Sequence, residues 1–229
     1  MRDLCVVFDI DDTLYLERDY VMSGFAAVGP WAHAWLGIPD FAERCRKEHN
    51  SGTRGRIFNK VLDDCGLPVT DEVIGTLLAL YRTHVPQIRL CEDAASALEE
   101  ISRTRPIAII TDGPAISQSR KAEALQLSRF ASPIYLTELH GTECSKPSPV
   151  VFQNLQRTID ANRFVYVADN PLKDFTAPAT LGWNTIRVRR PGGLHYELES
   201  VAVKTNFEIP DCTVLPRLLS GLGFRGVAG

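Results

Sequence analysis

Three carboxylates follow a short apolar run near the start of the chain. The run ends at Phe8, and Asp9, Asp11 and Asp12 come directly after it. An apolar run of this length without polar alternation indicates a strand buried on both faces of a parallel sheet. Clustered acids repel one another, so they need exposure, protonation or a cation, and Mg²⁺ suits them best because it prefers oxygen ligands. The stretch therefore predicts a magnesium site at the carboxyl end of the first strand, where open α/β sheets bind their ligands.

Two later apolar runs also end in polar residues, and a lysine stands before a helix. The second run ends at Thr111, the third is followed by Asp169, and Lys146 lies in a Ser-Lys-Pro step. A parallel sheet brings the ends of its strands to one edge. Carboxylates, a hydroxyl, a lysine and a cation together would bind a phosphoryl group while one carboxylate attacks phosphorus. Each residue alone has a simpler explanation as a helix cap, a turn or a solvated charge. The hypothesis of a phosphoryl-binding site therefore rests on their occurrence together, each at the end of a strand or before a helix.

Strand and helix patterns alternate from residue 91 onward. This alternation predicts an α/β fold, a Rossmann-like parallel sheet with right-handed crossovers and helices on both faces. The last expected elements are a strand over residues 207–209 and a helix near residues 214–222. We expect residues 1–14 and 91–229 to form this catalytic core.

Residues 15–90 contain no strand candidate. Apolar residues at helical spacing predict four or five helices there, as an inserted all-helical domain. The pair Gly29-Pro30 predicts a break, with a new helix starting near Trp31, because proline disrupts a helix interior.

The composition is typical of a globular enzyme. Of the 229 residues, 45% are hydrophobic and 23% charged, and the net charge is −3. This balance gives no reason to expect nucleic acid or a membrane surface as a partner. The six cysteines are scattered, which favours reduced thiols in a cytoplasmic protein. The five histidines show no zinc-ligand spacing, and no apolar stretch is long enough for a membrane span.

The polar strand ends, taken in order, resemble the four motifs of the haloacid dehalogenase-like superfamily. Residues 9–13 match its Asp-x-Asp-x-Thr motif, Thr111 its second motif and Lys146 its third. The fourth is Asp169 with Asp174. The resemblance spans most of the chain and implies a Rossmann-like fold, with the inserted helices as the helical cap found in part of the family.

The resemblance implies a magnesium-dependent phosphatase that hydrolyses a small phosphomonoester through an aspartyl-phosphate. Asp9 would be the nucleophile and a metal ligand. Asp11 would act as general acid and base and offer its backbone carbonyl to the metal, which Asp169 would also ligate. Thr111 and Lys146 would hold the phosphoryl oxygens.

Further positions follow from the same resemblance. A backbone N–H of Asp112 or Gly113 would help to bind phosphate, and Asp174 would support the metal or orient Lys146. The chain departs from the family pattern in two places. It has Ala168 where the fourth motif usually has glycine, and Asp112 where the second motif often has asparagine.

Alternative functions remain open from the sequence. The dehalogenase branch of the family lacks the second aspartate of the first motif, so Asp11 argues against carbon–halogen chemistry. It does not separate a phosphatase from a phosphomutase. A non-catalytic binding protein that retains the fold is a third hypothesis, although no catalytic position is missing.

The substrate is expected to be a small phosphorylated metabolite. Arg54 and Arg56 flank Gly55 in the helical insertion, and we expect them to pair with an anionic part of that substrate. The alternative is that both are solvated charges at a helix start. The identity of the substrate, the oligomeric state and the role of residues 191–204 stay open.

Overall fold

The chain forms two compact units. The computed structural model describes residues 3–199 and 203–221. The first unit, called here the core unit, consists of Met1–Glu17 and Arg89–Gly229. The second, called the helical unit, is Arg18–Ile88.

A six-stranded parallel sheet forms the centre of the core unit. Its strand order is β3-β2-β1-β4-β5-β6, and every neighbouring pair is parallel. The strands are β1 (Leu4–Phe8), β2 (Ile107–Thr111), β3 (Ile134–Leu136), β4 (Arg163–Ala168), β5 (Asn184–Val188) and β6 (Phe207–Ile209). The prediction of a Rossmann-like α/β core is confirmed.

Strand β1 lies between β2 and β4 and is buried along its whole length. Val6 is aligned with Ile107 of β2 on one side and with Val165 of β4 on the other. Because the three strands are parallel and in this register, their carboxyl ends meet at one edge of the sheet. The residues that follow β1, β2 and β4 are therefore brought together.

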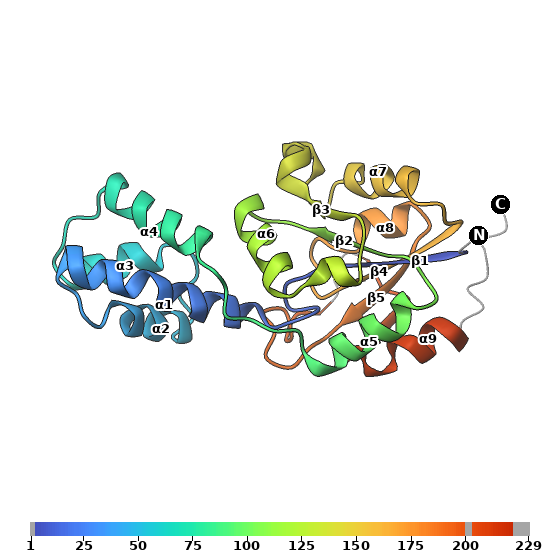
Figure 1. Cartoon of the computed structure of the whole chain (residues 1–229), viewed down its shortest axis with the longest axis horizontal. Coiled ribbons are helices and arrows are strands. Elements are labelled where there is room, and N and C mark those ends of the chain that lie inside the picture. Colours follow the sequence, from blue (N-terminus) through green and yellow to red (C-terminus); the bar gives the residue numbers. More distant parts are fainter. Residues whose placement is uncertain (1–2, 200–202, 222–229) are drawn as a thin grey trace. The chain divides into compact units, whose positions relative to one another are not determined.

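Helices cover both faces of this sheet (Figure 1). Helices α7 (Val150–Thr158) and α8 (Thr176–Thr180) lie on one face, and α5 (Glu92–Ser102) and α9 (Leu215–Gly221) on the other. Helix α6 (Ala115–Ala124) follows β2. The helix expected near residues 214–222 corresponds to α9, and residue 222 lies outside the described residues. The described part of the unit also contains four short 3₁₀ helices: η1 (Leu127–Arg129), η2 (Thr137–His140), η3 (Thr142–Cys144) and η4 (Cys212–Val214).

The face under α7 is built from aromatic and aliphatic side chains. Phe152 and Leu155 of α7 are fully buried against the sheet, together with Tyr166 of β4. Trp183 stacks on Phe164 with ring centroids 4.5 Å apart. Burial of these large side chains stabilises the sheet, which in turn holds the polar residues at its strand ends in place.

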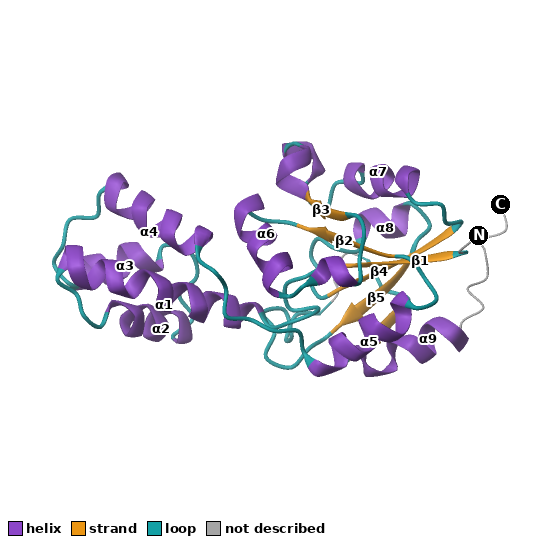
Figure 2. Ribbon diagram, in the orientation of Figure 1, coloured by secondary structure: helices purple, strands orange, loops and turns teal. Residues whose placement is uncertain are grey.

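The helical unit contains only helices and loops among its described residues (Figure 2). Most of α1 (Glu17–Leu36), and all of α2 (Phe41–Asn50), α3 (Ile57–Asp64) and α4 (Asp71–Thr83), belong to it. Each helix contributes to one buried cluster, with Val28, Phe41, Leu62 and Leu77 all nearly inaccessible to water. The unit therefore has a hydrophobic core of its own.

The expected break at Gly29-Pro30 is wrong. Helix α1 runs without interruption through Pro30. Pro30 and Ala26, one helical turn earlier, are both exposed, so the carbonyl that loses its helical partner can bond to water. The buried side of the helix, including Val28 and Ala32, continues across the proline. Packing of that side outweighs the local cost.

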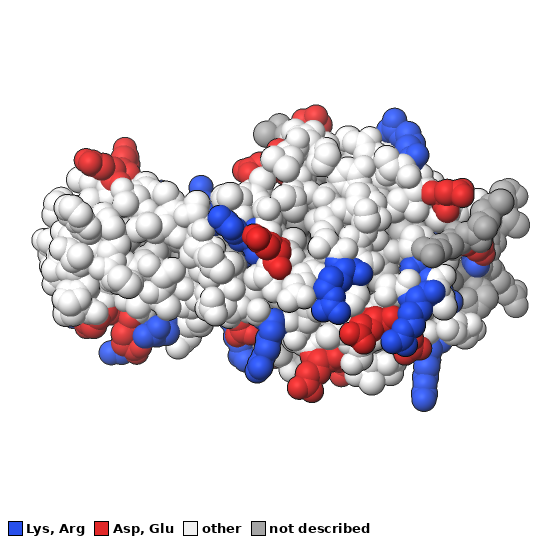
Figure 3. All heavy atoms as spheres, viewed as in Figure 1, with Lys and Arg blue, Asp and Glu red and all other residues white. Residues whose placement is uncertain are grey.

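Charged side chains of both signs are interspersed on the face of the core unit shown in Figure 3. This agrees with the small net charge of −3. Within residues 3–199 and 203–221, no helix is both long and apolar enough to cross a membrane.

Candidate active site

The turn after β1 is shaped by Asp12. Its φ of 52° lies in the left-handed region, which aspartate tolerates better than most residues. Its carboxylate accepts hydrogen bonds from the backbone N–H of Glu17 and of Leu194, both at 2.8 Å. Leu14 N donates to Ile10 O at 3.0 Å and closes the turn. Asp12 therefore holds the first-motif turn in place.

Lys146 lies at the centre of a buried charge cluster. Its Nζ is 2.8 Å from Oδ1 of Asp9, 2.8 Å from Oδ1 of Asp174 and 3.0 Å from the hydroxyl of Tyr166. Burial alone would lower the pKa of Lys146, but the carboxylates of Asp174 and Asp9 outweigh it and hold the pKa well above its usual value. This raised pKa favours the charged form of Lys146 between the two acids.

Three carboxylates come together beside this ammonium. One oxygen each of Asp9, Asp169 and Asp174 lies within 4.8 Å of the others, and all three residues are buried. Burial raises the pKa of Asp9 to about 6, against the opposing effect of Lys146. Burial likewise raises the pKa of Asp169 to about 7. The raised pKa values indicate that the positive charge nearby does not balance the negative charge of these acids. Their carboxylate oxygens are ligands that suit a hard divalent cation such as Mg²⁺.

The loop after β5 reaches this cluster through His195. Nδ1 of His195 lies 2.8 Å from Oδ2 of Asp169. One ring nitrogen of His195 and one carboxylate oxygen each of Asp169 and Asp12 lie within 4.8 Å of one another. The fully buried Arg187 anchors the loop by donating to His195 O at 2.8 Å and Leu198 O at 2.7 Å. The sequence left the role of residues 191–204 open; the part of that segment around His195 and Leu198 is therefore tied to the strand ends, and residues 200–202 lie outside the described residues.

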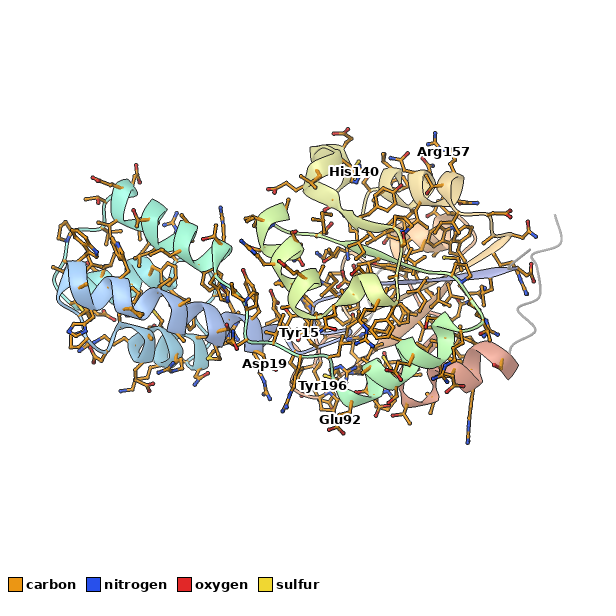
Figure 4. The ribbon with its side chains drawn as sticks, viewed as in Figure 1. Tyr15, Asp19, Glu92, His140, Arg157 and Tyr196 are labelled. Carbon is orange, nitrogen blue, oxygen red and sulfur yellow. The ribbon has the colours of Figure 1, made fainter. Side chains whose placement is uncertain are left out.

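Asp11 lies in a separate set of contacts. Its Oδ1 accepts from the hydroxyl of Tyr15 at 2.5 Å and from Lys121 Nζ at 2.7 Å, and its Oδ2 from Lys121 Nζ at 2.8 Å and Gln118 Nε2 at 2.9 Å. Burial would raise the pKa of Asp11, but Lys121, Tyr15 and Gln118 outweigh it and the pKa is lowered. Figure 4 shows Tyr15 in the segment that follows β1. The two first-motif acids therefore have different partners.

The end of β2 presents a hydroxyl and a carboxylate. Thr111 is 1% exposed, and its Oγ1 has no hydrogen-bond partner among the described residues. Asp112 points away from it: Oδ1 accepts from Thr137 Oγ1 at 2.9 Å and Lys146 N at 3.2 Å, and Oδ2 from Lys173 Nζ at 2.9 Å. Asp112 thus links β2 to the segment of Lys146, and Thr111 keeps an unused donor.

In the helical unit, Arg54 and Arg56 are both exposed. Arg54 Nη1 donates to His49 O at 2.7 Å and to Thr53 O at 3.0 Å within its own loop. Arg56 has a φ of 32° and directly precedes α3. Contact of either arginine with a substrate stays a prediction.

Sequence reasoning missed several residues that contact the first-motif and fourth-motif acids. Gln118 and Lys121 are three residues apart on the helix after Thr111, a spacing that places them on one face but does not indicate that this face turns toward Asp11. His195 lies in a loop and carries no such signal.

Known proteins share this fold and part of the sequence. The chain is 26% identical over 203 residues to the glyceraldehyde 3-phosphate phosphatase of Methanocaldococcus jannaschii, covering 80% of this chain and 83% of the relative. Among solved structures, the HAD-hydrolase YfnB of Bacillus subtilis bound to magnesium gives a TM-score of 0.68 at 15% identity, covering 96% of this chain and 99% of YfnB. A 2-haloacid dehalogenase from Pseudomonas syringae gives a TM-score of 0.65 at 23% identity, covering 96% of this chain and 99% of the dehalogenase.

A match to a family model that covers most of the chain shows the family. A sequence model of the haloacid dehalogenase-like hydrolases matches residues 4–182, from β1 to the end of α8 and the turn after it. That span includes all four polar strand-end motifs. The chain therefore belongs to the haloacid dehalogenase-like hydrolases.

Proposed function

We propose that this hydrolase is a magnesium-dependent phosphatase that cleaves a small-molecule phosphomonoester through an aspartyl-phosphate on Asp9. The observation that carries the proposal is the separation of the two first-motif acids. Asp9 contacts Lys146 within the acid cluster, whereas Asp11 is held by Lys121 and Gln118. Two carboxylates with different surroundings can take different roles, one as nucleophile and one as acid and base. The pKa of Asp11 is lowered by its partners, so in this proposal Asp11 takes up its proton when the negative charge of the bound phosphate ester raises that pKa.

The reaction has two steps in this proposal. A carboxylate oxygen of Asp9 attacks phosphorus, the bond to the ester oxygen breaks, and Asp11 gives its proton to the leaving alkoxide. A water molecule then attacks the phosphorus of the aspartyl-phosphate and passes a proton to Asp11. This step releases inorganic phosphate and restores the carboxylate of Asp9.

Other residues bind and orient the phosphoryl group. Lys146 keeps Asp9 in place through its 2.8 Å contact and brings positive charge to the phosphoryl oxygens. The unpartnered hydroxyl of Thr111 supplies a hydrogen-bond donor. A backbone N–H of Asp112 or Gly113, in the turn between β2 and α6, supplies another.

The acid cluster would hold Mg²⁺. Asp9 and Asp169 would be direct ligands, together with the backbone carbonyl of Asp11, and Asp174 would support them while it orients Lys146. Bound Mg²⁺ would neutralise charge on the phosphoryl oxygens as the reaction proceeds.

Several observations favour a phosphorylated metabolite over a haloacid as substrate. The curated relative is a phosphatase. Asp11 supplies the proton that an alkoxide leaving group needs and a halide does not. The dehalogenase neighbours are similar at 23% identity or less and support the fold alone. In this proposal residues 18–88 form the cap that selects the substrate, and Arg54 and Arg56 pair with its anionic part.

Phosphate release from a panel of phosphomonoesters, measured with and without Mg²⁺, tests the proposal. We expect turnover only with the metal, and a loss of at least about 100-fold in Asp9→Asn. The exposed Asp160→Asn is the matched control and should keep full activity. Chloride release from 2-chloropropionate without phosphate release from any ester would contradict the proposal. Full activity of Asp9→Asn would refute its nucleophile.

A further inference from the structure

Three side chains outside the family motifs surround the carboxylate of Asp11. Lys121 and Gln118 come from α6, and Tyr15 from the segment after β1. We propose that Lys121, with Gln118 and Tyr15, is a positioning residue that fixes the carboxylate of Asp11 for proton transfer. The inference rests on the proposed function, because it assigns Asp11 the role of acid and base.

The side chains that contact Asp11 are buried. Lys121 is 3% exposed, Gln118 is 2% exposed and Tyr15 is inaccessible. Burying an ammonium or an amide is unfavourable unless it has polar partners. Side chains three residues apart lie on the same face of a helix, so α6 directs both polar groups toward Asp11. The burial of all three side chains indicates that they serve to hold Asp11 and are not ordinary solvent-exposed residues.

The side-chain amide of Gln118 connects Asp11 to the backbone after β2. An amide nitrogen has two N–H donors, and Nε2 uses one for Asp11 Oδ2 at 2.9 Å and the other for Asp112 O at 2.8 Å. Space for it depends on Gly113, because a Cβ there would lie 2.9 Å from Nε2. Gly113 also has a φ of 127°, which side-chain-bearing residues rarely adopt. The backbone after β2 thus leaves room for this amide.

Lys121 contacts both carboxylate oxygens of Asp11. The distances from its Nζ are 2.7 and 2.8 Å, so it can keep hold of one oxygen while the other exchanges a proton. Together the three side chains make four contacts with two oxygens, which restricts rotation of the carboxylate. Proton transfer needs a heavy-atom approach of about 2.6–3.2 Å, so a fixed orientation favours it.

The experiment compares two esters that differ in their need for an acid. A p-nitrophenolate leaves without protonation, whereas an alkoxide must receive a proton. Lys121→Met removes the ammonium and keeps the side-chain length, and kcat/KM reports the step in which the ester bond breaks. We expect kcat/KM of Lys121→Met to fall about 100-fold with an alkyl phosphate and less than about 10-fold with p-nitrophenyl phosphate. Asp11→Asn should show the same pattern, and the exposed Lys204→Met should match the wild type with both esters.

Further variants separate positioning from folding. Lys121→Arg keeps the charge and should recover part of the alkyl phosphate activity. Gln118→Leu should show the same selective loss, about 10-fold, and serves if Lys121→Met fails to fold. Quenched reactions with p-nitrophenyl phosphate should trap more phosphorylated Lys121→Met than wild type, because hydrolysis of the aspartyl-phosphate also needs Asp11.

Two results would overturn the inference. Equal losses with both esters would show that Lys121 acts through general stability, and no loss with either would show that Asp11 does not need it. The failure of the proposed function is a different result, because then the wild type would release no phosphate from any ester with Mg²⁺ present.

Discussion

The Nζ atom of Lys146 lies 2.8 Å from Oδ1 of Asp9, although 137 residues separate them in the chain. The same atom lies 2.8 Å from Oδ1 of Asp174, so one ammonium is shared by two carboxylates. The side chain of Lys146 is 1% exposed, which leaves this cation little exchange with water. Charge balance at the strand ends therefore depends on one lysine as well as on any bound cation.

Lys146→Met should lower both stability and activity. Its removal leaves Asp9 and Asp174 buried without their ammonium, which we expect to cost about 3 kcal/mol of unfolding free energy. Phosphatase activity should fall by about 100-fold or more. Mg²⁺ should raise the melting temperature of this variant more than that of the wild type, because the cation replaces missing positive charge. Thermal melts with and without Mg²⁺ measure this, and equal shifts in both proteins would argue against the shared role.

Asp169→Asn tests the metal site without relying on turnover. An amide has one oxygen and no negative charge, so it is a weaker ligand for a hard cation. We expect the variant to lose most of the Mg²⁺-dependent rise in melting temperature and most of the heat of Mg²⁺ binding in calorimetry. Asp160→Asn should bind like the wild type. Unchanged binding by Asp169→Asn would remove Asp169 from the ligand set.

Thr111→Val separates phosphate binding from folding. The hydroxyl of Thr111 is buried without a partner among the described residues, so replacing it with a methyl group of similar size should not lower the melting temperature. Loss of the donor should reduce kcat/KM about 10- to 100-fold. Thr111→Ser should recover most of it. A large fall in melting temperature together with normal kinetics would instead show that the hydroxyl is structural.

The sequence predicted the parts of the molecule that depend on buried strands. β1, β2 and β4 are mostly apolar, which predicts buried parallel strands with their carboxyl ends at one edge, but it does not predict the order of the strands in the sheet. The partners of Asp11 could not be predicted in the same way. Two of them, Lys121 and Gln118, depend on how α6 is rotated about its axis, which is set by the turn at Gly113 and by packing.

Loops and solvent contacts account for the other differences. The position of His195 depends on backbone contacts with the buried Arg187, and no pattern in the sequence encodes them. Pro30 does not break the helix because Ala26, whose carbonyl loses its helical partner, is exposed to water. For His195 the deciding interaction is a side-chain contact within the same segment of the chain, and for Pro30 it is exposure to water; neither has a periodic sequence pattern.

Asp93 joins three segments of the core unit away from the acid cluster. It lies at the start of α5 and accepts two hydrogen bonds from Arg190, at 2.9 and 2.8 Å, and one from Cys212 N at 2.8 Å. Burial would raise the pKa of Asp93, but these hydrogen bonds outweigh it and the pKa is lowered. Arg190 also donates to Thr13 O at 2.9 Å, which connects the network to the first-motif turn.

Asp93→Asn should therefore destabilise the core unit in a pH-dependent way. A carboxylate whose pKa is lowered by folding adds stability above its unfolded pKa of about 3.9 and loses it as the pH falls through the lower folded value. We expect a deficit of about 2 kcal/mol at pH 7, discounted for partial exposure, that shrinks below about pH 4 as the wild-type carboxylate is protonated. Urea unfolding followed through Trp183, with Trp31 and Trp35 replaced by phenylalanine, measures the core unit alone. A deficit that stays constant or grows between pH 7 and pH 3 would contradict this assignment, because an unperturbed or raised pKa gives no stabilisation that acid can remove.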